Sequence, residues 1–348
     1  MAPVVRYLVL WLTTGCNLNC AYCYRGEDNS PQLMSVKVAE KALRLAATSG
    51  LPFHVQLAGG EPTLATQMIY DIARHVRASS LPATLGLQTN GTLINGRFID
   101  IVRHFDIQLG ISLDGPPEVQ EIIRGGAKET LRGLRLLADN GIEFRVTTVV
   151  TDQNVNYLSG LVLMLAGFPN ARGIGLDLLV TKGRATQGSI CHPSGERFRA
   201  GLIEFLRTLE ATNARREFPI QFRELERVRR TMVAQEPGAY CYACRGESMA
   251  VLPDGRIYPC SQTAGDPQFA SGTVEKPCWE RLCELGDHRL HGTSCPSCPL
   301  EIGCPGDCPS RQFYNDHISK SLACVMYKTL WSHGNLAHSQ PSPRWMFA

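Results

Sequence analysis

Three cysteines stand close together near the start of the chain, in the stretch GCNLNCAYCYRG that covers residues 15–26. They are Cys16, Cys20 and Cys23, and the whole chain of 348 residues holds 14 cysteines. Cysteines at such spacing form disulfides, bind zinc or hold an iron–sulfur cluster. The rest of the sequence has to decide among these three chemistries.

Disulfides are disfavoured because nothing in the sequence directs the chain out of the cytoplasm. Residues 1–12 are apolar, but Arg6 interrupts them and no small-residue cleavage site follows, so we expect a buried strand rather than a signal peptide. No apolar run approaches the roughly 20 residues of a membrane span. The net charge of +3 is too small to indicate a nucleic acid or a membrane surface as a partner. We therefore expect a soluble cytoplasmic protein whose thiols stay reduced and bind metal.

The three-cysteine loop is one ligand short of a closed metal site. Structural zinc takes four ligands, and no fourth Cys or His lies near the loop in sequence, although His54 from elsewhere in the fold is an alternative ligand. A [4Fe–4S] cluster normally takes four cysteines, so three cysteines leave one iron open to another ligand. An open iron is typical of a cluster that does chemistry.

Most of the other cysteines gather in a Cys-, Pro- and Gly-rich stretch, residues 241–324, which we call the C-terminal cysteine segment. Their CxxC pairs and neighbouring single cysteines suit two closed four-cysteine sites, either iron–sulfur clusters or zinc ribbons. Three cysteines remain outside these sites, and we expect free or buried thiols for them, with Cys191 the alternative contact to a substrate. They are Cys191, Cys278 and Cys283.

Alternating strand and helix patterns must position these cysteines. Apolar, β-rich runs predict strands at 4–12, 53–57, 84–88, 107–113, 144–150 and 173–180. Helical periodicity lies between them, at 36–48, 66–78, 96–104, 130–140 and 155–165. Such βα units predict an α/β fold, a partial TIM-like (β/α)6 barrel with a parallel sheet covered by helices. Active sites of such barrels lie at the carboxyl ends of the strands, and the three-cysteine loop follows the first strand.

The chain changes character after the barrel pattern. We expect the partial barrel over 1–193, a helical linker over 194–240 and a small metal-binding domain over 241–330. The third of these has little apolar periodicity, so metal clusters would have to stabilise it. Residues 331–348 are expected to form a loosely held C-terminal tail.

The front half resembles the radical S-adenosylmethionine (SAM) superfamily. The resemblance lies in the CxxxCxxC loop after a first strand, followed by GGEP (59–62), QTNG (88–91) and ISLDG (111–115) at later strand ends. It implies that Cys16, Cys20 and Cys23 hold a [4Fe–4S] cluster whose open iron binds SAM, and that reductive cleavage of SAM yields a 5′-deoxyadenosyl radical. It also implies SAM contacts from residues along the strand ends. These are Tyr22, Gly59, Gly60, Glu61, Asn90, Ser112, Asp114 and Arg124.

The C-terminal cysteine segment resembles the SPASM extension of radical SAM enzymes. Its spacing, Gly255-x4-Cys260 after a CxxC pair and then C-x2-C-x5-C-x3-C, reproduces that signature. The resemblance implies a small Cys-rich SPASM domain with two auxiliary [4Fe–4S] clusters, and three clusters in all. Auxiliary cluster I would take Cys241, Cys244, Cys260 and Cys308. Auxiliary cluster II would take Cys295, Cys298, Cys304 and Cys324.

SPASM enzymes act mainly on peptides, and we expect oxidative modification of a ribosomally made peptide by a thioether or carbon–carbon cross-link. Sulfatase maturases carry an Asp directly after the Cys of Gly-x4-Cys, where this chain has Ser261, so a sulfatase-type substrate is disfavoured. The alternatives are a porphyrin or another small molecule as substrate and, outside enzymes, a zinc-stabilised binding protein. Because the cysteine loop begins at residue 15, we expect a separate peptide-recognition protein or the enzyme's own surfaces to bind the peptide.

The reaction would also need a base and an electron donor. Asp177, Asp254 and Asp307 lie near the predicted barrel mouth or the cysteine turns and are candidate bases. Asp254, in a PDG turn, is more typical of a turn residue, and Asp307 of a backbone cap. A reductase, flavodoxin or ferredoxin would supply the electron, and an auxiliary cluster would accept the one released by a net oxidation.

Overall fold

The computed structural model describes most of the chain. The described residues are 4–26, 30–234, 239–288, 295, 297–301, 303–304 and 306–333. Most of the predicted tail, residues 334–348, lies outside them.

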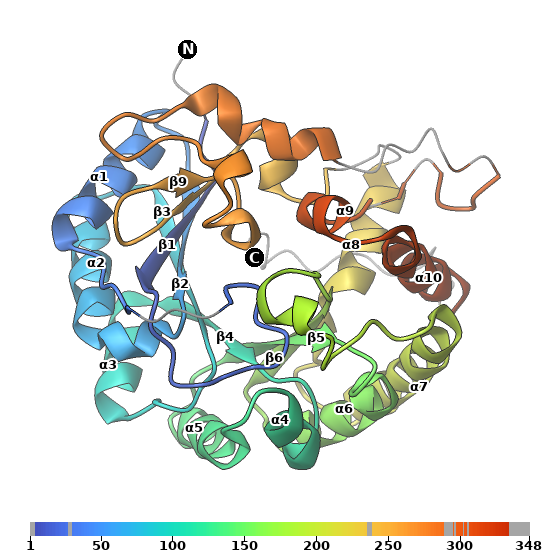
Figure 1. The fold of residues 1–348 in the computed structure, drawn as a ribbon. Helices are drawn as coiled ribbons and strands as arrows, with labels where there is room; N and C mark the ends of the chain where they lie inside the picture. Colours follow the sequence, from blue (N-terminus) through green and yellow to red (C-terminus); the bar gives the residue numbers. More distant parts are fainter. Residues whose placement is uncertain are drawn as a thin grey trace.

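A single curved sheet forms the centre of the molecule (Figure 1). Its strands are β1 (Tyr7–Thr13), β2 (Phe53–Gly59), β3 (Ala83–Thr89), β4 (Ile107–Ser112), β5 (Phe144–Val150), β6 (Ala171–Leu178), β7 (Gln221–Phe222), β8 (Ser248–Val251) and β9 (Ile257–Tyr258). Their order is β7-β6-β5-β4-β3-β2-β1-β8-β9, and every neighbouring pair is parallel except β8 and β9. The predicted partial barrel of six parallel strands is confirmed, and the short strands β7, β8 and β9 extend it.

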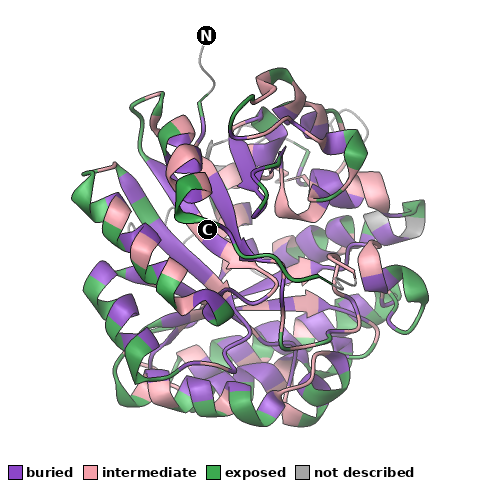
Figure 2. Cartoon of the chain, turned by 60° about the vertical axis from the view of Figure 1, so that its left-hand side comes forward, coloured by how far each residue is buried: buried purple, intermediate pink, exposed green. Residues whose placement is uncertain are grey.

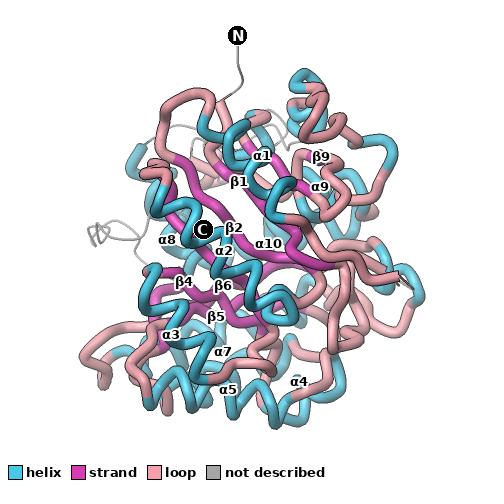
Figure 3. The backbone as a smooth tube through the Cα atoms, turned by 90° about the vertical axis from the view of Figure 1, so that its left-hand side faces the viewer, coloured by secondary structure: helices cyan, strands magenta, loops and turns pink. Residues whose placement is uncertain are grey.

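Helices cover the outer face of this sheet, as Figures 1 and 3 show, except for the short helix α9 (Pro309–Tyr314), whose Phe313 and Tyr314 pack on an apolar cluster at the inner side of β1. They are α1 (Val36–Ala47), α2 (Thr66–Ala78), α3 (Gly96–Phe105), α4 (Pro117–Ile123), α5 (Ala127–Asp139), α6 (Leu158–Ala166), α7 (Gly195–Asn213), α8 (Arg223–Ala234), α9 (Pro309–Tyr314) and α10 (His317–His333). Helix α1 illustrates how they form. The Ser35 side chain caps it by accepting a hydrogen bond from Val38 N, and the buried residues Ala39, Ala42, Leu43 and Ala46 share one helical face.

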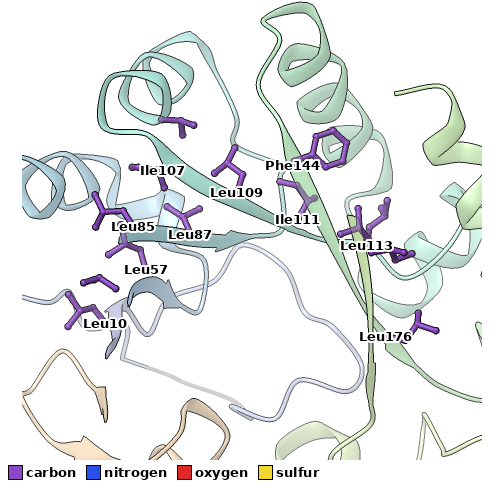
Figure 4. Close-up of a cluster of buried hydrophobic side chains, with 14 of the residues drawn as sticks. Leu10, Leu57, Leu85, Leu87, Ile107, Leu109, Ile111, Leu113, Phe144 and Leu176 are labelled. Carbon is purple, nitrogen blue, oxygen red and sulfur yellow. The ribbon is translucent and has the colours of Figure 1, made fainter. Parts of the chain in front are cut away.

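The two faces of the sheet differ in chemistry. Apolar side chains such as Leu57, Leu85 and Leu109 project outward and form the main core with the helices (Figure 4). Figure 2 shows that burial follows this layer, with the strands buried and the outer sides of the helices exposed. The inward positions of β2 to β6 instead carry mainly Gln, Gly, Thr and Arg, so these strands are not apolar on both faces as the sequence pattern suggests. The barrel therefore encloses a polar interior.

The C-terminal cysteine segment joins the same sheet. Strand β8 pairs with β1, and a second apolar cluster, which includes Val9, Trp11, Tyr258 and Phe269, lies between the segment and the inner side of β1. The segment thus buries an apolar core of its own, which its sequence pattern does not predict. Helix α10 ends at His333 and so crosses the border at 330/331 where the sequence predicts the start of the tail.

None of the helices in the described part of the chain combines the length and the apolar character needed to cross a membrane.

Candidate metal and cofactor site

The predicted site residues of the front half meet at one edge of the sheet. The three-cysteine loop follows β1, Glu61 follows β2, Asn90 follows β3, and Ser112 ends β4. These strands are parallel neighbours, so their carboxyl ends lie side by side. The position agrees with the rule for active sites in βα barrels.

Two glycines let the ends of β1 and β2 approach each other closely. Gly59 has φ of 145°, and a Cβ on it would overlap Thr13 O, while a Cβ on Gly60 would overlap Gly15 O. Two backbone hydrogen bonds close this contact, from Gly60 N to Thr13 O at 2.8 Å and from Glu61 N to Gly15 O at 2.9 Å. These two glycines therefore let the start of the three-cysteine loop approach the end of β2 at backbone distance.

The Glu61 carboxylate ties the ends of β2 and β3 together. It is buried, and its Oε1 accepts hydrogen bonds from Thr63 N at 3.0 Å, Thr63 Oγ1 at 2.5 Å and Thr89 Oγ1 at 2.6 Å. Its Oε2 accepts one bond, from Asn90 N at 2.8 Å. All four donors are neutral. The carboxylate is therefore held rigidly, and Oε2 keeps capacity for a further donor.

Asn90 holds the three-cysteine loop from the end of β3. Its Nδ2 donates to Asn17 Oδ1 at 2.9 Å, and Asn17 Nδ2 donates to Thr92 Oγ1 at 2.8 Å. Asn17 and Thr92 were not among our predicted site residues, because nothing in their local sequence marks a contact across 75 residues. Ser112, on the next strand, accepts a hydrogen bond from Gln88 Nε2 at 2.9 Å.

Tyr22, Asp114 and Arg124 form a buried polar group beside Cys20. The Tyr22 hydroxyl donates to Asp114 Oδ2 and accepts from Arg124 Nη1, and Arg124 Nη1 lies 3.6 Å from Asp114 Oδ2. Burial raises the pKa of Asp114, although the Arg124 charge opposes this, and burial also raises the pKa of Tyr22 well above its usual value. Arg124 Nε is buried without a hydrogen-bond partner in the described structure. The group thus joins the loop to the end of β4 and leaves one donor unused.

The thiols of the three-cysteine loop lie close enough to influence one another. Burial raises the pKa of Cys16, and the charges of Glu61 and Cys23 raise it further. The pKa of Cys20 is raised by burial, against the lowering effect of Arg124, and then by Cys23, Asp114 and Cys16. Among the described residues no three Cys, His, Asp or Glu side chains converge as a ready metal-binding group. The loop therefore places the three thiols near one another, but they do not converge as ligands of a single metal ion.

His54 is not placed to complete a site with these thiols. It lies at the start of β2, opposite Tyr7 at the start of β1, whereas the three-cysteine loop follows the far end of β1. Its ring nitrogens contact Thr84 Oγ1 at 2.8 Å and Gln56 Oε1 at 3.3 Å. The zinc alternative with His54 as fourth ligand is therefore wrong for this fold.

The C-terminal cysteines fall into two groups. Cys241 Sγ and Cys244 Sγ lie 3.9 Å apart, and the pKa of Cys241 is raised by the Cys244 hydrogen bond, by burial, and by the charges of Cys244, Cys308 and Cys260. In the second group, burial raises the pKa of both Cys304 and Cys324, with further contributions from neighbouring thiols. For Cys304 these are Cys295 and Cys298, and for Cys324 they are Cys295 and Cys304. In each case the thiols that act on one another belong to the same implied set, and the assignment of these sets to two metal sites stays a prediction.

The three candidate bases lie in different surroundings. Asp307 is buried and accepts two hydrogen bonds from Arg311 Nη1, both at 2.7 Å, which gives it a structural role. Asp254 is bonded to Arg256 in its turn, at 2.6 Å. Asp177 is partly exposed on β6. Its neighbours Leu176 and Leu178 point outward into the main core, so Asp177 points to the opposite, inner face of the strand, where it pairs with Arg223 Nη2 at 2.6 Å. Of the three, Asp177 is the one that faces the barrel interior.

Ser261 and two aromatic residues connect the two cysteine regions. Trp11 Nε1 donates to Ser261 Oγ at 3.2 Å, and the Trp11 and Tyr24 rings meet edge to face with centroids 6.4 Å apart. Burial raises the pKa of Tyr24, followed by the charges of Cys23 and Cys260, so Tyr24 lies near both thiols. Ser261 is thus a structural partner of Trp11 in the interior.

Comparison with known proteins places the chain in a family. The model of the radical SAM superfamily matches residues 12–165. An uncharacterized protein of Methanocaldococcus jannaschii is 30% identical over 273 residues, which cover 76% of this chain and 88% of that protein. The chain belongs to the radical SAM superfamily. This radical SAM chain is also 25% identical to a serine-type anaerobic sulfatase-maturating enzyme of Klebsiella aerogenes, over 85% of this chain and 77% of that enzyme. An AdoMet-dependent heme synthase of Methanosarcina barkeri is 28% identical, over 91% of this chain and 96% of that enzyme.

Solved structures share the fold of the radical SAM chain over almost its whole length. Native anSMEcpe with bound AdoMet superposes with a TM-score of 0.75 at 18% identity, covering 94% of this chain and 96% of that one. SuiB of Streptococcus suis, bound to S-adenosylmethionine, superposes with a TM-score of 0.64 at 18% identity, covering 91% and 77%. The superposed region covers most of the C-terminal part as well, so the predicted fold, a partial barrel followed by a Cys-rich region, is confirmed.

Proposed function

We propose that this radical SAM enzyme binds a [4Fe–4S] cluster through Cys16, Cys20 and Cys23, binds SAM beside it, and oxidatively modifies a ribosomally made peptide. Radical SAM enzymes use a SAM-bound [4Fe–4S] cluster, and when bound the pair supplies a 5′-deoxyadenosyl radical that abstracts a substrate hydrogen. The observation that carries the proposal is the meeting of three buried or half-buried thiols with Glu61 and Arg124 at one sheet edge.

The residues around the loop fit such a pair. The iron–sulfur core of a cluster is positively charged and takes thiolates as ligands, so it would offset the burial and the neighbouring negative charges that raise the pKa of Cys16 and Cys20. The remaining capacity of Glu61 Oε2 suits the amino group of SAM. The unused Arg124 Nε suits a carboxylate, and Gln120 Nε2 is a second buried donor without a partner in the described structure. Tyr22, Asn90, Ser112 and Asp114 would hold these groups in position.

The C-terminal cysteine segment would hold two further [4Fe–4S] clusters. Within each predicted set the thiols act on one another's pKa, and burial raises the pKa of Cys260 as well as that of Cys308, the latter to about 12. Such thiols need a metal cation to become thiolates inside the protein. Two zinc sites are the alternative, and the membership in an iron–sulfur superfamily favours iron.

A peptide is the favoured substrate because structural neighbours were solved with peptides. One anSMEcpe structure contains a bound Cp18Cys peptide, and one SuiB structure contains the precursor peptide SuiA. Ser261 has a neutral hydroxyl where sulfatase maturases have the Asp base, and this hydroxyl accepts a hydrogen bond from Trp11 Nε1. A thioether or carbon–carbon cross-link is therefore favoured over sulfatase maturation. A ferredoxin, flavodoxin or reductase in the cytoplasm and a separate peptide-recognition protein would complete the system.

Asp177 is the favoured base of this reaction. It faces the interior, and Arg223 Nη2 at 2.6 Å holds one of its carboxylate oxygens. Arg223 also bonds Glu224, which is itself fixed by Leu176 N, so the pair is anchored to β6. A base must lie within hydrogen-bond reach of the substrate proton that it takes. Asp177 is open to the barrel interior, where such a substrate would bind.

A porphyrin is the second candidate substrate. The heme synthase of Methanosarcina barkeri aligns with more of this chain, and at higher identity, than the sulfatase-maturating enzyme of Klebsiella aerogenes. The test is to incubate the anaerobically reconstituted enzyme with dithionite and SAM, adding either a peptide encoded beside it or an iron porphyrin precursor. Consumption of the peptide with loss of two hydrogens supports the proposal. Conversion of the porphyrin with an unchanged peptide would overturn the peptide assignment.

A further inference from the structure

The loop between β6 and α7, residues 179–194, contacts both cysteine regions. Three consecutive residues in it, 182–184, contact the backbone next to cysteines of both regions, and we call them the bridge segment. No motif in the sequence indicates a role for them, and neither the SAM contacts nor the proposed base involves them. Their hydrogen bonds run to backbone carbonyls up to 164 residues away.

Arg184 fixes the three-cysteine loop. Its backbone N donates to Cys23 O at 3.0 Å, and its side-chain Nε donates to Cys20 O at 2.9 Å. The side chain is buried, with 8% of the residue exposed. Two consecutive cysteines of the loop are therefore held by one residue, through carbonyls rather than through sulfur.

Gly183 lets the bridge segment cross the loop at backbone distance. It has φ of +61°, and a Cβ on it would lie 2.5 Å from Cys23 O, 2.6 Å from Tyr24 O and 2.7 Å from Gly26 N. Those atoms are all backbone, so a side chain at this position could not be accommodated by a rotamer change. Gly188 in the same loop also has a positive φ, +77°, but a Cβ there would meet nothing within 4 Å.

Lys182 fixes the turn that follows Cys260. Its Nζ donates to Gln262 O at 2.7 Å and to Ala264 O at 3.0 Å, and it lies 5.1 Å from the centre of the Tyr314 ring. Gln262 N in turn donates to Cys260 Sγ at 3.5 Å. The ammonium group is partly buried among these partners, and its charge acts on Cys260.

We propose that the bridge segment sets the position of the three-cysteine loop relative to the Cys260 turn, and that the Lys182 charge raises the reduction potential of the metal centre bound there. This inference rests on the proposed function, because it assumes iron–sulfur centres at both places. Hydrogen bonds and nearby charges are the means by which a protein tunes such a potential. A positive charge stabilises the more negative, reduced state, so its loss makes reduction harder.

The experiment compares reconstituted full-length variants. Lys182→Met removes the charge and both bonds, and Lys182→Arg keeps the charge. Arg184→Met is matched by Arg197→Met, since Arg197 is an exposed arginine that also donates to a carbonyl, Asp152 O. Gly183→Ala is matched by Gly188→Ala. The readouts are amide hydrogen exchange, iron per chain, and the midpoint potential of the centre whose electron paramagnetic resonance signal is lost in Cys260→Ala.

Each variant has its own expected result. Arg184→Met speeds amide exchange of residues 20–26 about tenfold, the effect of one lost hydrogen bond from a charged donor, and leaves residues 260–266 unchanged. Lys182→Met speeds amide exchange of residues 260–266 and leaves residues 20–26 unchanged. It also moves the midpoint potential of the metal centre bound by Cys260 to more negative values, whereas Lys182→Arg keeps the wild-type potential. Gly183→Ala loses about four irons, the content of one cluster, and Gly188→Ala loses none.

Two outcomes would overturn the inference. One is exchange in Lys182→Met and Arg184→Met that equals that of wild type. The other is a potential that Lys182→Met leaves unchanged, which would reduce Lys182 to a structural role. Failure of the proposed function is distinct from both, because it appears in the wild-type protein as absence of iron and of 5′-deoxyadenosine, while the exchange data still test the contacts.

Discussion

Replacing Glu61 with Gln tests whether the Glu61 carboxylate stabilises the contact between the ends of β2 and β3. The carboxylate accepts four hydrogen bonds from neutral donors, three at Oε1 and one at Oε2. An amide oxygen in the Oε1 position keeps the first three, but the amide NH2 then faces Asn90 N, and two donors cannot bond each other. One buried N–H is left unsatisfied and the charge assistance of the others is lost.

The expected cost follows from these bonds. An unsatisfied buried donor costs about 1–3 kcal/mol, and bonds to a charged group contribute about 1.5–3 kcal/mol each against roughly 1 for neutral ones. These effects are not additive, so the total is smaller than their sum. We expect Glu61→Gln to lower the free energy of unfolding by about 3 kcal/mol. The variant should also bind SAM about tenfold or more weakly, because the amino group loses a charged acceptor.

The assay is urea unfolding of the metal-free protein under reducing conditions, followed by SAM binding to the reconstituted protein. Glu217→Gln, at an exposed position on the surface, serves as the control and should change neither quantity. An unfolding free energy of Glu61→Gln within about 0.5 kcal/mol of wild type, the usual range of surface substitutions, would refute the reasoning. Unchanged SAM affinity would separately remove Glu61 from the SAM site.

Three further predictions follow from single contacts. Gly60→Ala should destabilise the protein because its Cβ overlaps Gly15 O, whereas Gly96→Ala, which meets nothing, should stabilise α3 by up to about 1 kcal/mol; thermal unfolding compares them. Asp177→Asn should slow substrate conversion about 10²- to 10⁴-fold in a product assay with 5′-deoxyadenosine still formed, while Asp307→Asn should instead lower stability by leaving a buried arginine. Burial lowers the pKa of His54 from 6.5, so the unfolded chain takes up a proton that the folded chain refuses, and stability should fall as the pH drops below about 6.5. Unfolding midpoints at about pH 7.5 and about pH 5.5 check this, and His54→Gln should lessen the difference.

The barrel could be predicted from the sequence because its strands and helices are strongly patterned. The run at 144–150 coincides with β5, and the helix at 66–78 coincides with α2. Strands β7, β8 and β9 were missed because they are only two to four residues long and are defined by their pairing with β6, β1 and β8. Their sequence carries no periodicity that could signal a strand.

The sequence could name candidate residues for the site but could not give their geometry. The spacing of Cys16, Cys20 and Cys23 placed them on one loop, and the structure keeps them there. The partners of Glu61 and Arg124 depend on which strand ends are neighbours, so the buried groups around them could not be derived from spacing. The contacts of Lys182 and Arg184 join segments far apart in sequence, and no local pattern marks them.

The most direct test of the central claim is iron and sulfide per chain on anaerobically reconstituted protein, with 5′-deoxyadenosine measured after dithionite and SAM. Wild type should hold about twelve irons and release the nucleoside, and a variant with Cys16, Cys20 and Cys23 all changed to Ala should hold about eight and release none. Zinc in place of iron, or nucleoside release by the triple variant, would contradict the account.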